Sequence, residues 1–203
     1  MQILTMPVGA YQTNCYMVWE DSADTCVLID PGYEPEVILE RVRQRNKTVA
    51  AILLTHGHFD HVGGVETIVR ETGCSLWMHQ GDYSQKKTPE NDYFYPIHDS
   101  DFTQVNFCEE GEIISVGGLE FRVMETPGHT WGSVCYVCEN VLFSGDTLFQ
   151  YSCGRTDLPG GDGKTIMESL LRLAAIKGDY RVLPGHGPAT TLFEEKRSNP
   201  FMV

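Results

Sequence analysis

Short apolar runs separated by turn residues dominate this chain, and most of them have the length and composition of strands. The pattern predicts strands at residues 2–6, 15–19, 25–29, 51–54, 75–78, 112–116, 120–125, 133–138, 141–144 and 181–183. Apolar residues at helical spacing predict helices at residues 36–45, 63–71 and 164–176. Strands in runs, with helices between them, indicate two sheets packed face to face with helices outside.

Residues 80–110 do not follow this pattern. The segment is polar, contains Pro89 and Pro96, and carries the aromatic cluster Tyr93, Phe94 and Tyr95. We predict a loop here, and a loop of this length inside a compact domain is usually functional or mobile. The aromatic cluster then either forms an apolar wall for substrate or packs beneath the loop. No repeat, low-complexity tract or linker stands out, so we expect one domain over residues 1–203.

The charge balance narrows the choice of partners. The chain has 28 acidic and 15 basic residues among 203, for a net charge of −13. Phosphate binding needs clustered Lys and Arg, so nucleic acid is not an expected partner. We also expect no membrane span, because no apolar run has the required length, and no signal peptide, because the N-terminus lacks a basic region. A cytoplasmic protein is the prediction, and its oligomeric state stays open.

Seven cysteines are present, an odd number, and most lie within apolar segments. Reduced thiols in a cytoplasmic protein are therefore expected. Cys135 and Cys138 form a C-x-x-C pair, a spacing used in redox and zinc chemistry. Residues 133–138 alternate like a strand, however, so these two side chains should point to opposite faces and serve packing.

The densest chemistry lies in the run from Thr55 to His61. It contains four side chains that bind metals, and it follows the predicted strand at 51–54: His56, His58, Asp60 and His61. Imidazole and carboxylate together suit Zn, Fe or Mn better than Ca or Mg. Four ligands cannot all reach one ion from a short extended loop, so the run predicts two adjacent metals.

Three later segments repeat the arrangement of a strand followed by glycine and a metal-binding side chain. These are Gly128-His129, Gly145-Asp146 and Gly185-His186. Glycine permits the tight backbone that turns a ligand back toward a common centre. We therefore predict that seven candidate ligands from four strand ends form one metal centre.

The pattern H-x-H-x-D-H, followed by a His, an Asp and a His, resembles that of the metallo-β-lactamase superfamily. The resemblance covers essentially the whole chain. It implies an α/β fold, an αββα sandwich of two mixed β-sheets flanked by helices, with the metal site at one edge. It also implies that one metal is held by His56, His58 and His129. The second would be held by Asp60, His61 and His186, with Asp146 bridging the two.

Within that superfamily the chain is similar to the glyoxalase II group, particularly its short bacterial hydrolases. The segments that carry this likeness are 128–130, 144–149, 154–157, 183–188 and 199–201. The resemblance implies a metal-dependent hydrolase of a small thioester of the hydroxyacylglutathione type, such as S-D-lactoylglutathione. Longer members of the group contact glutathione through a C-terminal helical domain, which we do not expect here, and they have an aromatic residue where this chain has Thr156-Asp157.

The expected cofactors are two divalent ions, with zinc the first choice and iron or manganese the alternatives. Two ions sharing one water lower its pKa to roughly neutral and so supply a bridging hydroxide as nucleophile. Asp60 and Asp146 are the expected catalytic carboxylates: Asp60 orients the hydroxide, and Asp146 offsets the repulsion between the two ions.

Two further enzymatic interpretations stay open, together with that of a metal-stabilised scaffold without activity. Residues 153–157 also resemble persulfide dioxygenases of the superfamily, which use one iron held by the equivalents of His56, His129 and Asp146. The other is hydrolysis of a different ester or thioester. A secreted β-lactamase is disfavoured by His61 and by Asp146 at the last shared ligand position.

Arg155 either contacts an anionic substrate group or forms an ion pair with Asp157 or Asp162.

Overall fold

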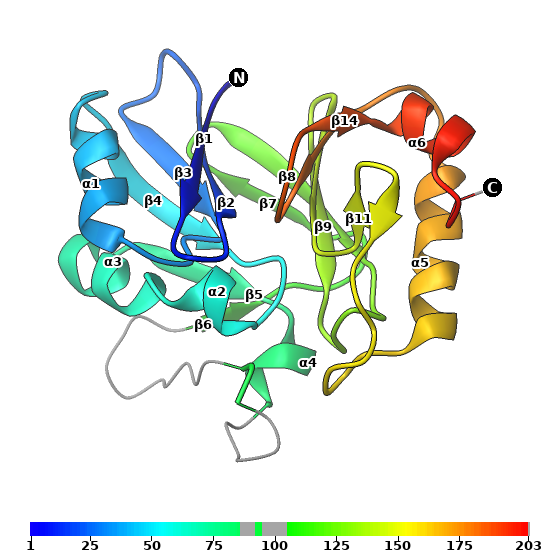
Figure 1. Ribbon diagram of the computed structural model, residues 1–203. Helices are drawn as coiled ribbons and strands as arrows, with labels where there is room; N and C mark the ends of the chain where they lie inside the picture. Colours follow the sequence, from blue (N-terminus) through cyan, green and yellow to red (C-terminus); the bar gives the residue numbers. More distant parts are fainter. Residues whose placement is uncertain (86–91, 95–104, 203) are drawn as a thin grey trace.

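The structure, a computed structural model, describes residues 1–85, 92–94 and 105–202 (Figure 1). Its described strands form two six-stranded sheets and a two-stranded hairpin. In the first sheet, spatial order follows the chain: β1 (Gln2–Val8), β2 (Thr13–Trp19), β3 (Thr25–Ile29), β4 (Thr48–Leu53), β5 (Ser75–Met78) and β6 (Val105–Phe107). This sheet is mixed, because β1 to β3 are antiparallel and β3 to β6 are parallel.

The second sheet is also mixed. Across it the strands are β14 (Thr190–Thr191), β13 (Arg181–Pro184), β10 (Val141–Gly145), β9 (Val134–Cys138), β8 (Leu119–Glu125) and β7 (Ile113–Val116). Only the β10–β13 pair is parallel among the strand pairs described in this sheet. The hairpin of β11 (Leu148–Phe149) and β12 (Ser152–Cys153) follows β10 along the chain.

Helices cover the outer face of each sheet (Figure 1). The described helices are α1 (Pro35–Arg43), α2 (Phe59–Val62), α3 (Val65–Thr72), α4 (Gln80–Tyr83), α5 (Gly163–Ala174) and α6 (Leu192–Ser198). Ile38 and Ile68 of α1 and α3 share a core with the first sheet, and Leu170 of α5 shares one with the second. A third core, with Tyr136 and Phe143, lies between the sheets. These layers confirm the predicted αββα sandwich. None of the described helices is long and apolar enough to cross a membrane.

Strand β9 shows how one strand serves two cores. Tyr136 and Cys138 face the core between the sheets, whereas Cys135 and Val137 face the core beneath α5. Successive side chains of a strand point to opposite faces. The prediction that Cys135 and Cys138 diverge is therefore confirmed, and both thiols are buried and free.

The predicted loop at residues 80–110 contains more regular structure than expected. Its start forms the short helix α4, and residues 105–107 form β6, which pairs with β5 in parallel. Three residues are too few for alternation to reveal a strand from sequence, since pairing with β5 rather than local propensity fixes it. Tyr95 of the aromatic cluster lies outside the described residues.

One more local expectation needs correction, and one element was not predicted. The run from Thr55 to His61 is not extended throughout, because its second half forms the helical turn α2. The C-terminal tail, for which no element was predicted, forms a helix, α6, whose first turn is capped by the Thr191 hydroxyl accepting from the Glu194 N–H at 3.2 Å. Thr191 and Glu194 have the spacing of a capping box, a sequence signal that identifies this helix.

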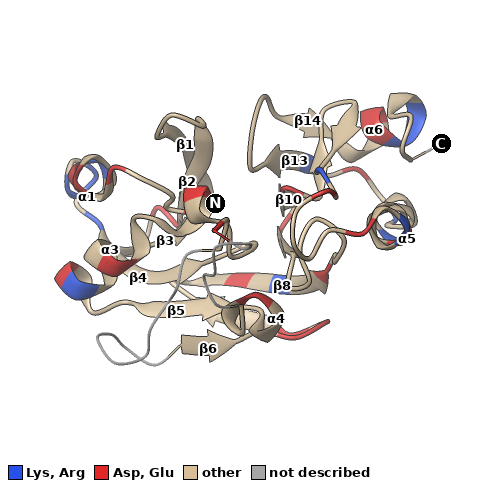
Figure 2. Cartoon of the chain, turned by 60° about the horizontal axis from the view of Figure 1, so that its bottom comes forward, with Lys and Arg blue, Asp and Glu red and all other residues tan. Residues whose placement is uncertain are grey.

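Basic side chains are spread over separate elements of the described structure. Lys and Arg lie on α1, α3, α5 and α6, each with acidic residues close by (Figure 2). For example, Arg70 pairs with Glu66 and Lys164 pairs with Glu168, in each case one helical turn away. Among the described residues, therefore, positive charge is not gathered on one face.

Candidate metal centre

The ligand run begins where β4 ends, and Asp30 fixes its starting point. Asp30 follows β3, the parallel neighbour of β4, so its carboxylate lies beside the first residue of the run. Its Oδ1 accepts the Thr55 N–H at 2.8 Å, and its Oδ2 accepts the Thr55 hydroxyl at 2.6 Å. The same Oδ2 lies 3.0 Å from His61 Nδ1. One buried carboxylate thus holds both ends of the run.

The other three candidates come from the second sheet. His129 follows β8, Asp146 follows β10, and His186 follows β13, as the sequence pattern predicts. At Gly185 an added Cβ would overlap Asp146 Oδ1 and lie 2.7 Å from His61 Cε1. Glycine is therefore required there because the side chains of two candidate ligands occupy the space.

Hydrogen bonds join the two sheets at this edge. Val134 N–H donates to the Thr55 carbonyl at 2.8 Å, and Asn14 N–H donates to the Gly185 carbonyl at 2.7 Å. The Tyr136 hydroxyl donates to the Leu54 carbonyl at 2.8 Å. The strand ends that carry the candidates are thus fixed relative to one another by both main-chain and side-chain contacts.

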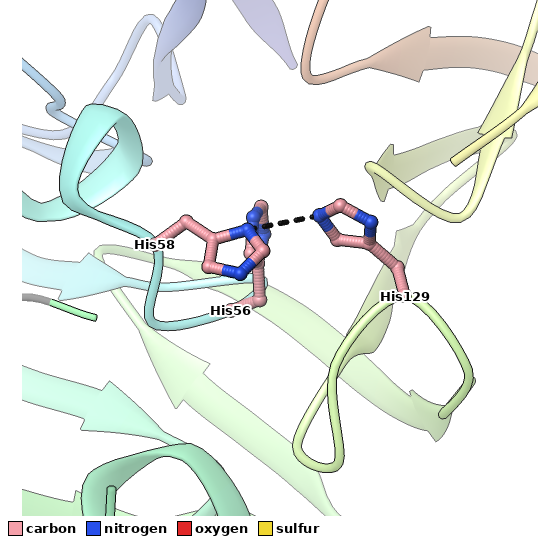
Figure 3. Close-up of side chains that lie close together, drawn as sticks. All are labelled: His56, His58 and His129. Carbon is pink, nitrogen blue, oxygen red and sulfur yellow. Dashed lines mark hydrogen bonds between the residues drawn. The ribbon is translucent and has the colours of Figure 1, made fainter. Parts of the chain in front are cut away.

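All seven predicted ligands meet at this edge. Their nitrogen and oxygen atoms form three overlapping groups, each with its atoms within 4.8 Å of one another: His56, His58 and His129; His56, His61 and Asp146; Asp60, His61 and His186. Figure 3 shows the three imidazoles of the first group, with His56 and His58 facing His129 across the space between the loops. Asp146 lies between the outer groups, since its Oδ1 is 3.4 Å from His61 Nε2 and its Oδ2 is 3.6 Å from His129 Nε2.

Hydrogen bonds indicate which ring nitrogen of His56, His129 and His186 carries a proton. His129 Nδ1 lies 2.8 Å from the Arg155 carbonyl, and His186 Nδ1 lies 3.1 Å from the Tyr11 carbonyl. A carbonyl only accepts, so both Nδ1 atoms are protonated. Thr55 already donates to Asp30, so its oxygen accepts from His56 Nδ1 at 3.1 Å. In His56, His129 and His186, Nε2 is therefore the ring nitrogen left to bind a metal.

Ring nitrogens from different loops face one another at the spacing that a metal ion requires. His61 Nε2 and His186 Nε2 are 3.3 Å apart, and His58 Nδ1 and His129 Nε2 are 3.0 Å apart. Zn–N bonds of about 2.0–2.1 Å at a tetrahedral angle give a ligand–ligand edge of roughly 3.4 Å. Three buried atoms have no hydrogen-bond partner among the described residues: His56 Nε2, His58 Nε2 and Asp146 Oδ1. The donor set therefore fits divalent cations.

The protonation states support the same conclusion. Burial and neighbouring histidines lower the pKa of His56 well below its ordinary value and that of His58 to about 3, so both rings are neutral. Burial opposes the charged form of His61, but the carboxylates of Asp146 and Asp30 outweigh it and raise its pKa to about 9. Burial opposes ionisation of Asp60 as well, yet hydrogen bonding to His186 holds its pKa below the usual range. The site is built to surround positive charge.

A pocket of about 530 Å³ opens in front of these groups. Besides candidate ligands, its walls include Tyr11, Phe59, Tyr93 and Phe149. The rings of Tyr11 and Phe59 meet edge to face, with centroids 5.4 Å apart. The pocket thus has an aromatic side next to the metal-binding atoms, suited to an apolar group of a small molecule.

The residues predicted to contact substrate lie in different environments. Tyr93 and Arg155 line the pocket, whereas Phe94 is 1% exposed and packs against the His58 ring with centroids 4.9 Å apart. Arg155 forms a bidentate ion pair with Asp157, with two N–O distances of 2.7 Å. Asp162 instead caps α5 through the Thr165 N–H.

Sequence reasoning missed the residues that support the ligands. Asp30 lies in a turn sequence, Asp30-Pro31-Gly32, and only its position at the end of the neighbouring parallel strand indicates its role. Thr13 donates to Asp60 Oδ2 at 3.0 Å, and Asp82 accepts from the loops that carry His58 and His129. Neither has a local motif, because both reach the site from distant parts of the chain.

Comparison with known proteins supports this description. The family model of the metallo-beta-lactamase superfamily matches residues 8–186. Hydroxyacylglutathione hydrolase GloC from Haemophilus influenzae is 36% identical over 209 residues, which cover 100% of this chain and 98% of that protein.

Three solved structures resemble the chain over nearly its full length. BLEG-1 B3 metallo-beta-lactamase has a TM-score of 0.89 at 33% identity and covers 100% of both chains. TTHA1623 in a di-iron-bound form has a TM-score of 0.83 at 39% identity, covering 98% of this chain and 99% of that one. ETHE1 from Myxococcus xanthus has a TM-score of 0.81 at 27% identity, covering 98% and 84%.

Proposed function

Because this chain belongs to the metallo-β-lactamase superfamily and is an enzyme of the hydrolase type, we propose that it cleaves a small thioester with two divalent metal ions. A hydroxyacylglutathione such as S-D-lactoylglutathione is the first candidate substrate, supported by the likeness to GloC. The observation that carries the proposal is the convergence of seven side chains in three overlapping groups, in which the buried His56 Nε2 and Asp146 Oδ1 have no hydrogen-bond partner among the described residues.

The ligand assignment follows the groups. His56, His58 and His129 would hold one ion, and Asp60, His61 and His186 the other. Asp146 would bridge them, because one of its oxygens faces His61 while the other faces both His129 and His186. Its negative charge between two cations would offset part of their repulsion.

The protein's own groups prepare the reaction. When bound, the two ions would supply Lewis acidity and lower the pKa of water toward neutrality. Asp60 stays ionised at neutral pH, and Thr13 fixes the orientation of its carboxylate. That carboxylate is placed to accept a hydrogen bond from the attacking water. A thiolate leaving group has a pKa of about 8.5, so the site does not need a strong general acid.

Zinc is the metal we propose, with iron or manganese as alternatives. A set of imidazole and carboxylate donors accepts all three, so availability decides occupancy. The di-iron-bound form of TTHA1623 shows that a protein of similar structure binds iron. A cytoplasmic location stays a prediction.

The first test is turnover of S-D-lactoylglutathione, followed by loss of the thioester absorbance, on protein whose metals have been counted. Turnover with about two metals per chain, as expected of a dinuclear hydrolase, supports the proposal. Two bound metals without turnover would refute this substrate and direct the search to other thioesters and esters. A β-lactam assayed in parallel is the control that the likeness to BLEG-1 requires.

A second candidate function is oxygen-dependent oxidation of a persulfide at a single iron. The likeness to ETHE1 favours it, together with the segment from Cys153 to Asp157. His56, His129 and Asp146 would form the required set of two histidines and one carboxylate. One iron per chain with oxygen consumption would select this function, whereas two metals without oxygen consumption would exclude it.

A further inference from the structure

Asp82 is a buried carboxylate next to the metal centre but outside the ligand set. It lies in α4 and is 3% exposed. Its Oδ2 accepts the Gly57 N–H and the Thr130 hydroxyl, both at 2.8 Å, and its Oδ1 accepts the Gly132 N–H at 2.7 Å. Gly57 separates His56 from His58, and Thr130 follows His129 directly. One side chain therefore binds the two loops that supply the first ligand group.

The backbone of both loops lies directly against Asp82. A Cβ added at Gly132 would be 2.6 Å from Asp82 N, and one added at Gly57 would be 3.1 Å from Asp82 Cβ. Neither glycine has a positive φ, so close approach rather than backbone conformation accounts for glycine at these positions. Asp82 therefore packs closely against both loops, and a displacement of Asp82 would displace both of them.

The two loops belong to different sheets, since one follows β4 and the other connects β8 to β9. The Val134–Thr55 hydrogen bond joins them at their base. Nearer their tips, the Asp82 carboxylate is their shared partner. The distance between His58 Nδ1 and His129 Nε2, 3.0 Å, depends on how these tips are held.

We propose that Asp82 is a positioning residue that holds the loops of His58 and His129 at the separation that one shared metal ion requires. The inference rests on the proposed function, because it assumes that both histidines bind the same ion. Asp82 itself contacts neither ion nor substrate; it acts through the two loops. Supporting groups of this kind typically change metal affinity about 10–100-fold when they are replaced.

Glu195 provides a matched control. It is fully buried in α6, and its carboxylate also accepts three hydrogen bonds, from the Thr190 hydroxyl, the Tyr151 N–H and the Asn199 side chain. None of these donors neighbours a candidate ligand. Glu195→Gln therefore perturbs a carboxylate clamp of the same kind, which separates loss of folding stability from loss of metal positioning.

The test uses Co²⁺ as the probe, because cobalt accepts the same donors and its visible spectrum reports ligand geometry. Metal-free wild-type chain, Asp82→Asn and Glu195→Gln are titrated with Co²⁺, and their thermal unfolding is measured without metal. In Asp82→Asn the amide places a donor against one of the two glycine N–H groups. We expect its Co²⁺ affinity to fall about 10–100-fold with an altered spectrum. Glu195→Gln should keep the wild-type Co²⁺ affinity and spectrum, even if its unfolding temperature falls as far as that of Asp82→Asn.

Wild-type affinity and spectrum in Asp82→Asn would overturn the role of Asp82 alone. Equal losses of affinity in both variants would also overturn it, since they would indicate general destabilisation. If the wild-type chain itself binds no Co²⁺, the proposed function fails and this inference fails with it. Thr130→Val, which removes one donor from the same carboxylate, covers the case in which Asp82→Asn does not fold: a smaller loss supports the role, and an unchanged spectrum contradicts it.

Discussion

The two outer groups of the metal centre differ in how their charge is balanced. The group of His56, His58 and His129 contains only imidazoles, and burial lowers the pKa of the first two. The group of Asp60, His61 and His186 contains a carboxylate, and Asp146 and Asp30 raise the pKa of His61 despite its burial. The first group thus presents buried lone pairs, whereas the second is held together by its own ion pairs.

This difference shows which group depends more on a cation. His56 Nε2, the ring nitrogen left for a metal, is buried without a hydrogen-bond partner among the described residues. Such atoms cost free energy unless something pairs with them. In the second group His186 Nε2 already lies 3.2 Å from Asp60 Oδ2, so a proton can replace a metal there. Asp146 contacts both groups, so its loss should affect both.

Asp146→Ala is expected to have the largest effect, because Asp146 contacts residues of both groups. Without the carboxylate between the groups, the chain should lose most of its metal and nearly all hydrolysis. A fall of about 10³-fold or more in kcat is expected, since such charge stabilisation is worth several kcal/mol. Elemental analysis and thioester turnover check this. Asp146→Asn keeps the shape without the charge, and two metals retained in Asp146→Ala would argue against bridging.

A pair of truncations tests the difference between the groups. His58→Ala should lower metal content more than His186→Ala, because His58 is buried in the all-imidazole group whereas the His186 side chain is 28% exposed. We expect hydrolysis to fall about a hundredfold or more in His58→Ala and less in His186→Ala. Metals per chain are counted in both. Equal losses would mean that the two groups fill only as one unit.

Asp30→Asn should weaken both groups at once, by an intermediate amount. Its carboxylate sets the orientation of His61 directly and that of His56 through Thr55. Metal affinity should fall about 10–100-fold, with activity falling alongside. Thr13→Val is the one-sided comparison, because Thr13 contacts only Asp60 among the candidate ligands. If Asp30→Asn binds zinc like the wild-type chain, Asp30 serves the fold alone.

Separation along the chain decides which parts of the fold and site the sequence could predict. His56, His58, Asp60 and His61 lie together in one run, and glycine precedes each later candidate ligand, so local pattern predicted the residues that the structure brings together. Alternation likewise predicted most strands and the face of Cys135. Asp30, Thr13 and Asp82 were missed because their partners are distant in sequence. Strand β6 and helix α4 were missed because tertiary contacts, rather than periodicity, define such short elements.

The smallest effect is expected from the Arg155 side chain, which lines the pocket; the Arg155 carbonyl that contacts His129 belongs to the main chain and is retained in a side-chain variant. Arg155 pairs with Asp157, and both side chains are more than half exposed, so Arg155→Ala should leave metal content and stability unchanged. If the guanidinium contacts an anionic part of the substrate, KM for S-D-lactoylglutathione rises several-fold with kcat preserved. Asp157→Asn is the matched variant, because it frees Arg155 from its partner and should lower KM. Unchanged KM in both variants would mean that this ion pair serves only the structure of the loop. Substrate binding would then be determined by the two metal groups and the aromatic walls of the pocket.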